Sequence, residues 1–210
     1  ELDNFLAGKM LIFFADETAN IRNVNEVTMK VSKVDAYSGA RGWITLAAGD
    51  AEFPLLALKA SGQSKFYSNT SVPAGVYSKI RVTVKDVSVE PKTGSRKSTA
   101  MPSREIEIPA TLRVNEGKST GMTIDVKADQ SLYTTKDEPG YIFMPVIRVQ
   151  TFNNVTVTTY SDSSIALGGG QMDLDATYGM DLAGTVRQNF KLDSATKLGI
   201  SATGTILILK

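Results

Sequence analysis

Cysteine and histidine are both missing from this sequence of 210 residues. Without cysteine the chain cannot form disulfide bonds or offer a thiolate nucleophile, so packing and backbone hydrogen bonds must hold the fold together. Without histidine it lacks the side chain that most often transfers protons near neutral pH and binds transition metals. The two absences favour a structural scaffold over a catalyst, and we expect that the protein is not an enzyme.

Strong net charge and long apolar runs are also missing. The chain carries 23 lysine and arginine residues against 22 aspartate and glutamate residues, for a net charge of +1. This balance gives no reason to expect binding to nucleic acid. The longest purely apolar run, MLIFFA at residues 10–15, is far shorter than the ~20 residues that span a bilayer. We therefore expect no membrane span.

The first residue of the chain is glutamate rather than methionine. We interpret the chain as a mature protein whose targeting segment has been removed, and we expect an extracellular or cell-surface location. Two N-x-S/T sequons, at Asn69 and Asn154, are compatible with glycosylation of such a surface protein. Sequons also arise by chance in a chain rich in serine and threonine, so they add little to the localisation.

Apolar and polar residues alternate along most of the chain, as they do in strands that bury one face. The clearest examples are VTMKV at 27–31 and IRVTV at 80–84. The apolar phase then shifts near Lys85 and Asp86, which predicts a β-bulge. A short helical turn is expected at 53–60. We predict an all-β fold, an Ig-like or transthyretin-like antiparallel β-sandwich with extra C-terminal strands.

Glycine, proline and asparagine residues indicate how the chain is divided. We expect residues 1–7 to be an N-terminal extension and residues 8–150 to form the β-sandwich. We expect residues 151–210 to be an additional β-rich segment that packs on the sandwich or completes it. The sequence Asn115-Glu116-Gly117 predicts a hairpin turn, and the three glycines that end at Gly170 predict a flexible joint.

Several blocks of the sequence, taken in order, resemble one known family. They are GKMLIFFAD at 8–16, VNEVTMKV at 24–31, GWITL at 42–46, PLLAL at 54–58, VPAGVYSKIRV at 72–82, TIDV at 123–126 and YIFMPVIRV at 141–149. As a set they are similar to the prokaryotic secreted family catalogued as domain of unknown function 4382, over about residues 8–150. The resemblance implies an extracytoplasmic β-sandwich, often found on bacterial or archaeal lipoproteins, without established catalytic residues.

Aspartates at two places could supply oxygen ligands for calcium. Asp173, Asp175 and Asp181 form one candidate set, and Asp125 with Asp129 forms another. The outward face of a strand shows the same D-x-D pattern without any metal, and the spacing of an EF-hand loop is missing. Calcium is therefore the one cofactor that we consider.

Three aromatic residues, Trp43, Tyr67 and Tyr77, could form a platform for a sugar ring. The alternative for Trp43 is a half-buried core position, which is the commoner role of a single tryptophan in a β domain. The positively charged residues that cluster in sequence lack the interleaved aromatics of a nucleic-acid platform, and we interpret them as a solvated hairpin loop: Lys92, Arg96, Lys97 and Arg104.

Apolar residues occur at both ends of the chain, where free tails are usually polar. Either both ends pair as strands within their own sandwich, or one of them adds as a strand to a neighbouring copy. The residues predicted to contact another copy are Leu2, Phe5, Leu6, Ile206, Leu207, Ile208 and Leu209. Head-to-tail contacts of this kind do not close, and so they build filaments.

The sequence therefore predicts a non-enzymatic extracellular structural subunit. We expect it to assemble with copies of itself into a surface filament by β-strand addition between subunits, with residues 1–7 as the preferred donor. The alternative is a monomeric cell-surface binding module for carbohydrate or protein. Long uniform fibres in electron micrographs of native material would favour the filament, and dispersed particles would favour the binding module.

Overall fold

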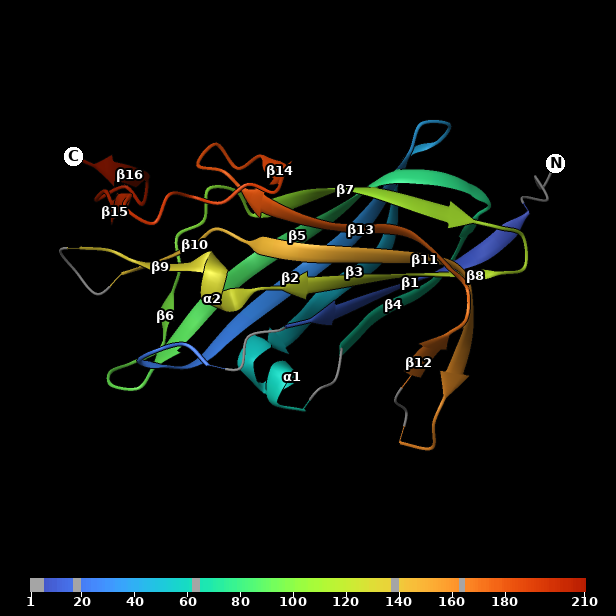
Figure 1. The fold of residues 1–210 in the computed structure, drawn as a ribbon, viewed down its shortest axis with the longest axis horizontal. Coiled ribbons are helices and arrows are strands. Elements are labelled where there is room, and N and C mark those ends of the chain that lie inside the picture. Colours follow the sequence, from blue (N-terminus) through green and yellow to red (C-terminus); the bar gives the residue numbers. More distant parts are fainter. Residues whose placement is uncertain (1–5, 17–19, 62–64, 137–139, 163–164) are drawn as a thin grey trace.

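Two β-sheets face each other across one hydrophobic core in this computed structural model (Figure 1). The structure describes residues 6–16, 20–61, 65–136, 140–162 and 165–210. The all-β class and the β-sandwich that the sequence predicts are both confirmed.

In the first sheet, called sheet A, the strands are arranged in an order that differs from their order in the sequence. Its strands are, in order, β14 (Val186–Gln188), β13 (Gln171–Met180), β11 (Val146–Thr159), β8 (Ser119–Val126), β1 (Ala7–Ala15) and β4 (Lys65–Pro73). A further strand, β12 (Ile165–Gly168), pairs with β11 alone. Strands β1 and β8 are parallel, which requires a long connection between them. That connection contains the whole of the second sheet.

The second sheet, called sheet B, is antiparallel throughout the described residues. Its strands are β3 (Gly42–Pro54), β2 (Val24–Ser38), β5 (Gly75–Pro91) and β6 (Lys97–Ser98), with β7 (Glu105–Val114) also paired to β5. Two small two-stranded sheets lie outside the sandwich layers: β9 (Leu132–Thr134) with β10 (Tyr141–Phe143), and β15 (Lys197–Ile200) with β16 (Ile206–Leu209). The hairpin of β5 and β6 confirms the predicted loop for Lys92 and Arg96, whereas Lys97 lies on β6 and Arg104 lies beyond it.

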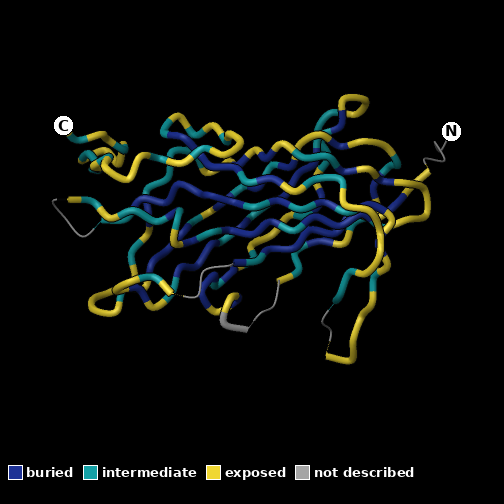
Figure 2. The backbone as a smooth tube through the Cα atoms, in the orientation of Figure 1, coloured by how far each residue is buried: buried dark blue, intermediate teal, exposed yellow. Residues whose placement is uncertain are grey.

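Alternation along the strands places one set of side chains from each sheet in the core, which runs through the middle of the molecule in Figure 2. Sheet B contributes the apolar residues of 27–31 and 80–84, as predicted. From sheet A, Phe14 packs against Phe53 with ring centroids 4.5 Å apart. Tyr77 is also buried, and its hydroxyl donates to the carbonyl of Pro73 at 2.8 Å. Tyr77 is therefore part of the core and cannot form a sugar platform.

The β-bulge predicted near Lys85 and Asp86 is confirmed. On β2, Lys30 lies opposite Asp86 and the next residue, Val31, lies opposite Val84, so Lys85 is the extra residue on β5. The extra residue restores the apolar phase to the core side, because side chains alternate with a period of two.

The turn at 115–117 exists, but the hairpin predicted there is wrong. The strands on either side of it, β7 and β8, belong to different sheets, so the turn carries the chain across the end of the sandwich. It is fixed to β1 by two backbone hydrogen bonds, from Gly117 to the carbonyl of Ala7 and from Lys9 to the carbonyl of Lys118, both at 2.8 Å. The residues of this turn are suited both to a hairpin within one sheet and to a crossing between two sheets, so the local sequence does not distinguish the two.

Sheet A continues across residue 150, where the sequence analysis divides the chain. That residue lies inside β11, which pairs with β8 on one side and β13 on the other. Downstream residues therefore extend sheet A through β13 and β14. The last two strands instead pack on a small second cluster of buried residues, made of Ile142, Met144 and Leu198.

The two helices are short. Helix α1 (Leu55–Ser61) confirms the helical turn predicted at 53–60, and α2 (Ala128–Ser131) is a single turn. Within the described ranges, no helix has the length and hydrophobicity needed to cross a membrane.

Candidate functional site

The edge strand β3 of sheet B is covered by side chains of β4, the edge strand of sheet A. The Thr70 hydroxyl donates to the carbonyl of Leu46 at 2.6 Å, and the Tyr67 hydroxyl donates to the carbonyl of Gly49 at 3.1 Å. The Lys65 ammonium donates to the carbonyl of Glu52 at 2.6 Å. A strand from another molecule would need these carbonyls, so this edge is protected against β-strand addition.

Strand β7, at the opposite side of sheet B, is protected in the same way. The Thr120 hydroxyl of β8 donates to the carbonyl of Arg113 at 2.6 Å, and the Thr151 hydroxyl of β11 donates to the carbonyl of Thr111 at 2.7 Å. Both threonines are almost fully buried, and these bonds satisfy their hydroxyl groups. Side chains of sheet A therefore cover both edge strands of sheet B, β3 and β7, which we call the protected flanks.

Strand β16 presents a different edge. It pairs with β15 on one side, and no other described strand pairs with it. The bond from Ser201 to the carbonyl of Thr205 fixes the alternation of this ladder. In an antiparallel pair every second residue directs its N–H and C=O away from the partner, so Ile206 and Ile208 direct theirs to the open edge. Leu207 and Ile208 have exposed fractions of 43% and 60%.

The opposite end of the molecule also carries exposed apolar side chains. Leu6 and Val76 have exposed fractions of 59% and 58%. They lie at the same end because the Ala74 N–H donates to the carbonyl of Leu6 at 2.7 Å. Figure 1 shows the N-terminal end of β1 and the C-terminal strand β16 at opposite ends of the long axis. Leu2 and Phe5, the other two residues predicted for this interface, lie outside the described residues.

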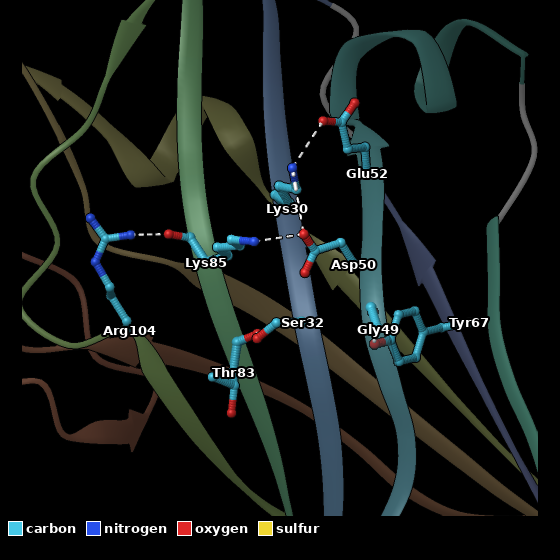
Figure 3. Close-up of polar contacts among 9 residues, drawn as sticks. All are labelled: Lys30, Ser32, Gly49, Asp50, Glu52, Tyr67, Thr83, Lys85 and Arg104. Carbon is cyan, nitrogen blue, oxygen red and sulfur yellow. Dashed lines mark hydrogen bonds and ion pairs between the residues drawn. The ribbon is translucent and has the colours of Figure 1, made fainter.

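A band of bulges crosses sheet B where β3, β2 and β5 lie side by side (Figure 3). Backbone carbonyls near the bulges accept hydrogen bonds from side chains instead of strands. The Ser32 hydroxyl donates to the carbonyl of Thr83 at 3.3 Å, and the Arg104 guanidinium donates to the carbonyl of Lys85. Side chains of the protein therefore satisfy the carbonyls of Thr83 and Lys85, while the buried Thr83 hydroxyl has no hydrogen-bond partner among the described residues.

Charged side chains line the outer surface of this band. Asp50 accepts a hydrogen bond from Lys85 at 2.7 Å and lies 3.6 Å from the ammonium of Lys30, which also lies 3.9 Å from Glu52 (Figure 3). The hydrogen bond from Lys85 is the main cause that holds the pKa of Asp50 below its ordinary value of 3.8. The cluster alternates in sign, so it has no net preference for a charged ligand.

The pKa of Asp50 gives a direct test of this cluster. Its folded pKa lies below its unfolded pKa, so its contribution to stability is present above pH 3.8 and is lost as the pH falls through the lowered value. We expect Lys85→Met to raise the pKa of Asp50 toward 3.8, measured by NMR titration of the carboxyl carbon. The matched control Lys79→Met, on the same strand, should leave it unchanged. An unchanged pKa in Lys85→Met would show that the contact does not form.

The remaining aromatic residues do not form a sugar platform either. Tyr67 is partly buried against the core. Trp43 is half-buried on the outer face of sheet B, where Tyr37 packs against it at a centroid distance of 5.3 Å. The guanidinium of Arg81 lies 4.1 Å from the centre of the Trp43 ring and also donates to Asp35. Protein groups therefore occupy the ring of Trp43, and neither the platform nor a core position describes it.

The structure does not bring the first set of predicted calcium ligands together. Asp173 is the extra residue at a register shift of β13, so it does not share a face with Asp175 as an unbroken strand would require. Asp173 accepts from Asn153 at 2.7 Å, and Asp175 pairs with Arg148 at 2.8 Å. Asp181 pairs with Arg187 at 2.8 Å.

Asp173 also lies 3.8 Å from the guanidinium of Arg113, so each carboxylate of that set has an arginine partner of its own. The donor bonds of Arg148 are also the main cause of the lowered pKa of Asp175. Of the second set, Asp125 is buried on β8 and Asp129 is exposed in α2. No group of three or more acidic side chains fit to hold a metal occurs in the part of the chain that the structure describes. The calcium site predicted at Asp173, Asp175 and Asp181 is therefore wrong.

Both sequon asparagines are exposed. Asn69 lies on β4, and Asn154 lies on β11 where its side-chain oxygen accepts from Asn115 at 2.9 Å. Glycosylation at these two residues stays a prediction.

The protected flanks and the band of bulges are the features that sequence reasoning missed. Their side chains are separated in sequence by tens of residues from the carbonyls that they bind, as with Thr151 and Thr111. The alternation pattern places Thr151 on the core side of β11, in phase with Val149. A buried threonine in a strand is thus a weak signal of such a bond, because its hydroxyl must find an acceptor.

Comparison with known proteins identifies one family. The family described as Domain of unknown function (DUF4382) matches residues 7–145, close to the range over which the sequence resembles it. No curated protein matches the chain significantly. No solved structure does so either. Because the match spans more than half of the sequence and coincides with most of the sandwich, the chain belongs to the DUF4382 family.

Proposed function

We propose that this chain is a non-enzymatic structural subunit of an extracellular or cell-surface filament, built by β-strand addition between copies. The observation that carries this proposal is the edge of β16. It combines outward backbone groups at Ile206 and Ile208 with exposed apolar side chains at Leu207 and Ile208. The edge strands of sheet B, β3 and β7, are covered by comparison, and β16 lies outside the sandwich layers, so addition at β16 leaves the sandwich itself unchanged.

Residues 1–7 contain the strand that we propose to add to β16 of the next copy, while Ala7 itself stays in β1 opposite Pro73. It enters the described fold at Leu6 and Ala7, at the end of the molecule opposite to β16 (Figure 1). A contact between opposite ends is heterologous, and a heterologous contact whose rotation does not close into a ring continues into a filament.

Charge and hydrophobicity are complementary between the two ends. The segment 1–7 contains two acidic residues, Glu1 and Asp3, together with Leu2, Phe5 and Leu6. At the other end Lys136 and Lys197 line one hollow beside β15. Lys210 follows β16 directly. Opposite charges steer the encounter, and the apolar side chains of the two strands supply the contact area.

Proline at position 208 tests the proposal. Ile208→Pro removes an N–H that faces the open edge and leaves the ladder with β15 intact, because prolines are tolerated where the N–H faces away from the partner strand. We expect this variant to form no fibres in negative-stain electron micrographs, under conditions in which the unmodified chain polymerises. Ile208→Ala is the matched control, since it loses the same side chain but keeps the N–H.

The alanine control should polymerise at a higher protein concentration than the unmodified chain. Circular dichroism of both variants would check that the sandwich remains folded. Fibres in Ile208→Pro equal to those of Ile208→Ala would contradict addition at this edge. An unmodified chain that stays monomeric in light scattering at all accessible concentrations would overturn the filament itself.

A further inference from the structure

The end of β11 leaves sheet A together with β12. Residues 156–159 pair with β12 alone, over the register from Thr156 opposite Gly168 to Thr159 opposite Ile165. Figure 1 shows this pair projecting from the end of the sandwich, and we call it the arm. Its ladder is self-contained, so it can move as a unit without losing its internal hydrogen bonds.

The two strands of the arm, its outgoing and returning legs, both contain left-handed backbone where the arm leaves sheet A. On the outgoing leg, Asn154 has φ 51°, beside a register shift between Phe152 and Val155. On the returning leg, Gly169 and Gly170 have φ 63° and 78°. Left-handed backbone is uncommon for a residue other than glycine, and it marks the place where the strand changes direction. These two positions define a hinge.

The arm has a shaped seat on the outer face of sheet A. A Cβ atom placed on Gly121 of β8 would lie 2.4 Å from Cδ1 of Leu167, so the glycine leaves the space that the end of the Leu167 side chain occupies. Gly121 lies between Leu11 of β1 and Phe152 of β11. Leu11 is fully buried although its neighbours Met10 and Ile12 are the ones that enter the main core. The seat is therefore an apolar strip on sheet A, and the arm shields it from water.

We propose that the arm exchanges between two copies of this chain, so that Leu167 of one copy occupies the seat at Gly121 of the other. The exchanged contacts are identical to those within one chain, and the hinge allows the arm to swing outward, which are the two conditions for domain swapping. A second copy is the occupant that we propose because its arm carries the same Leu167 and the same ladder as the arm that fills the seat within one chain. This contact is separate from β16 and does not depend on the proposed filament.

Two single-cysteine variants test the exchange, because the chain has no cysteine of its own. Gly121→Cys and Leu167→Cys are purified separately, mixed at equal concentration, incubated, and oxidised with diamide. A disulfide between residues 121 and 167 can then form only between two chains. Peptide mass spectrometry distinguishes it from the disulfides that join two identical variants. In Gly121→Cys the chain's own Leu167 is displaced, so its seat more readily accepts the smaller side chain on the arm of the Leu167→Cys variant.

Ser98→Cys mixed with Leu167→Cys is the matched control, since Ser98 is exposed on β6 of the other sheet. We expect about 100-fold more 121–167 disulfide than 98–167 disulfide, because a seated arm raises the effective concentration of the thiols from about 10 micromolar to about 1 millimolar. A chain carrying both Gly121→Cys and Leu167→Cys checks that the two positions can form the bond. Equal yields from the two mixtures, while the double variant forms its internal bond, would overturn arm exchange. That outcome would leave the test at Ile208 unaffected.

Discussion

Replacing Phe14 with alanine should lower the free energy of unfolding by about 3–5 kcal/mol, the largest loss that we expect from any core side chain. Phe14 lies on β1 with only 1% of its surface exposed. Its ring contacts those of Phe53 and Tyr67, at centroid distances of 4.5 Å and 5.9 Å. The loss combines the transfer free energy of the ring with the cavity that remains between the two sheets. Urea denaturation measures it.

Tyr160→Ala is the control for this effect. Tyr160 has an exposed fraction of 54%, so its removal should change the free energy of unfolding by less than about 0.5 kcal/mol. A loss below about 1 kcal/mol in Phe14→Ala would mean that the core repacks around the missing ring, contrary to the close packing described.

Replacing Gly8 with alanine should cost about 3 kcal/mol, although it adds a single methyl group. A Cβ atom at this position would lie 2.5 Å from the carbonyl oxygen of Asn115 and 2.8 Å from that of Lys118. Both are backbone atoms of the turn that joins the two sheets. The turn cannot move away without breaking its hydrogen bonds to Ala7 and Lys9.

Gly39→Ala provides the matched comparison for Gly8→Ala. A Cβ atom at Gly39 would have no heavy atom within 4 Å, and its backbone is not left-handed. We therefore expect this variant to be neutral or slightly stabilising in thermal denaturation, because alanine restricts the unfolded chain. Equal losses from both variants would show that the turn over Gly8 yields easily.

The strands could be predicted from sequence because alternation is a local property. The same holds for the bulge at Lys85, which shifts the apolar phase within a few residues. The parallel pairing of β1 with β8 could not be predicted, because it depends on which distant strands meet. The turn at 115–117 illustrates the limit: its residues specify a turn and leave the sheet of the next strand open.

The candidate sites were harder to predict than the fold, because one extra residue in a strand changes the face of the sheet to which the neighbouring side chains point. The register shift at Asp173 separates Asp173 from Asp175, which the D-x-D pattern alone would place together. At the C-terminal end, the apolar pattern of 206–209 correctly indicated a strand, β16. Its open edge became visible only from the phase of its hydrogen bonds with β15.

The positions of β1 and β16 at opposite ends also determine how the molecule would respond to mechanical force. Strand β1 is bonded on both sides, to β4 and to β8, so tension along its axis loads all of those bonds in shear at once. The open end of the β15–β16 pair places Lys197 beside Leu209. Tension that pulls these two residues apart breaks the hydrogen bonds between β15 and β16 one after another. A pulled subunit should therefore yield first at its C-terminal pair while the sandwich keeps its shape.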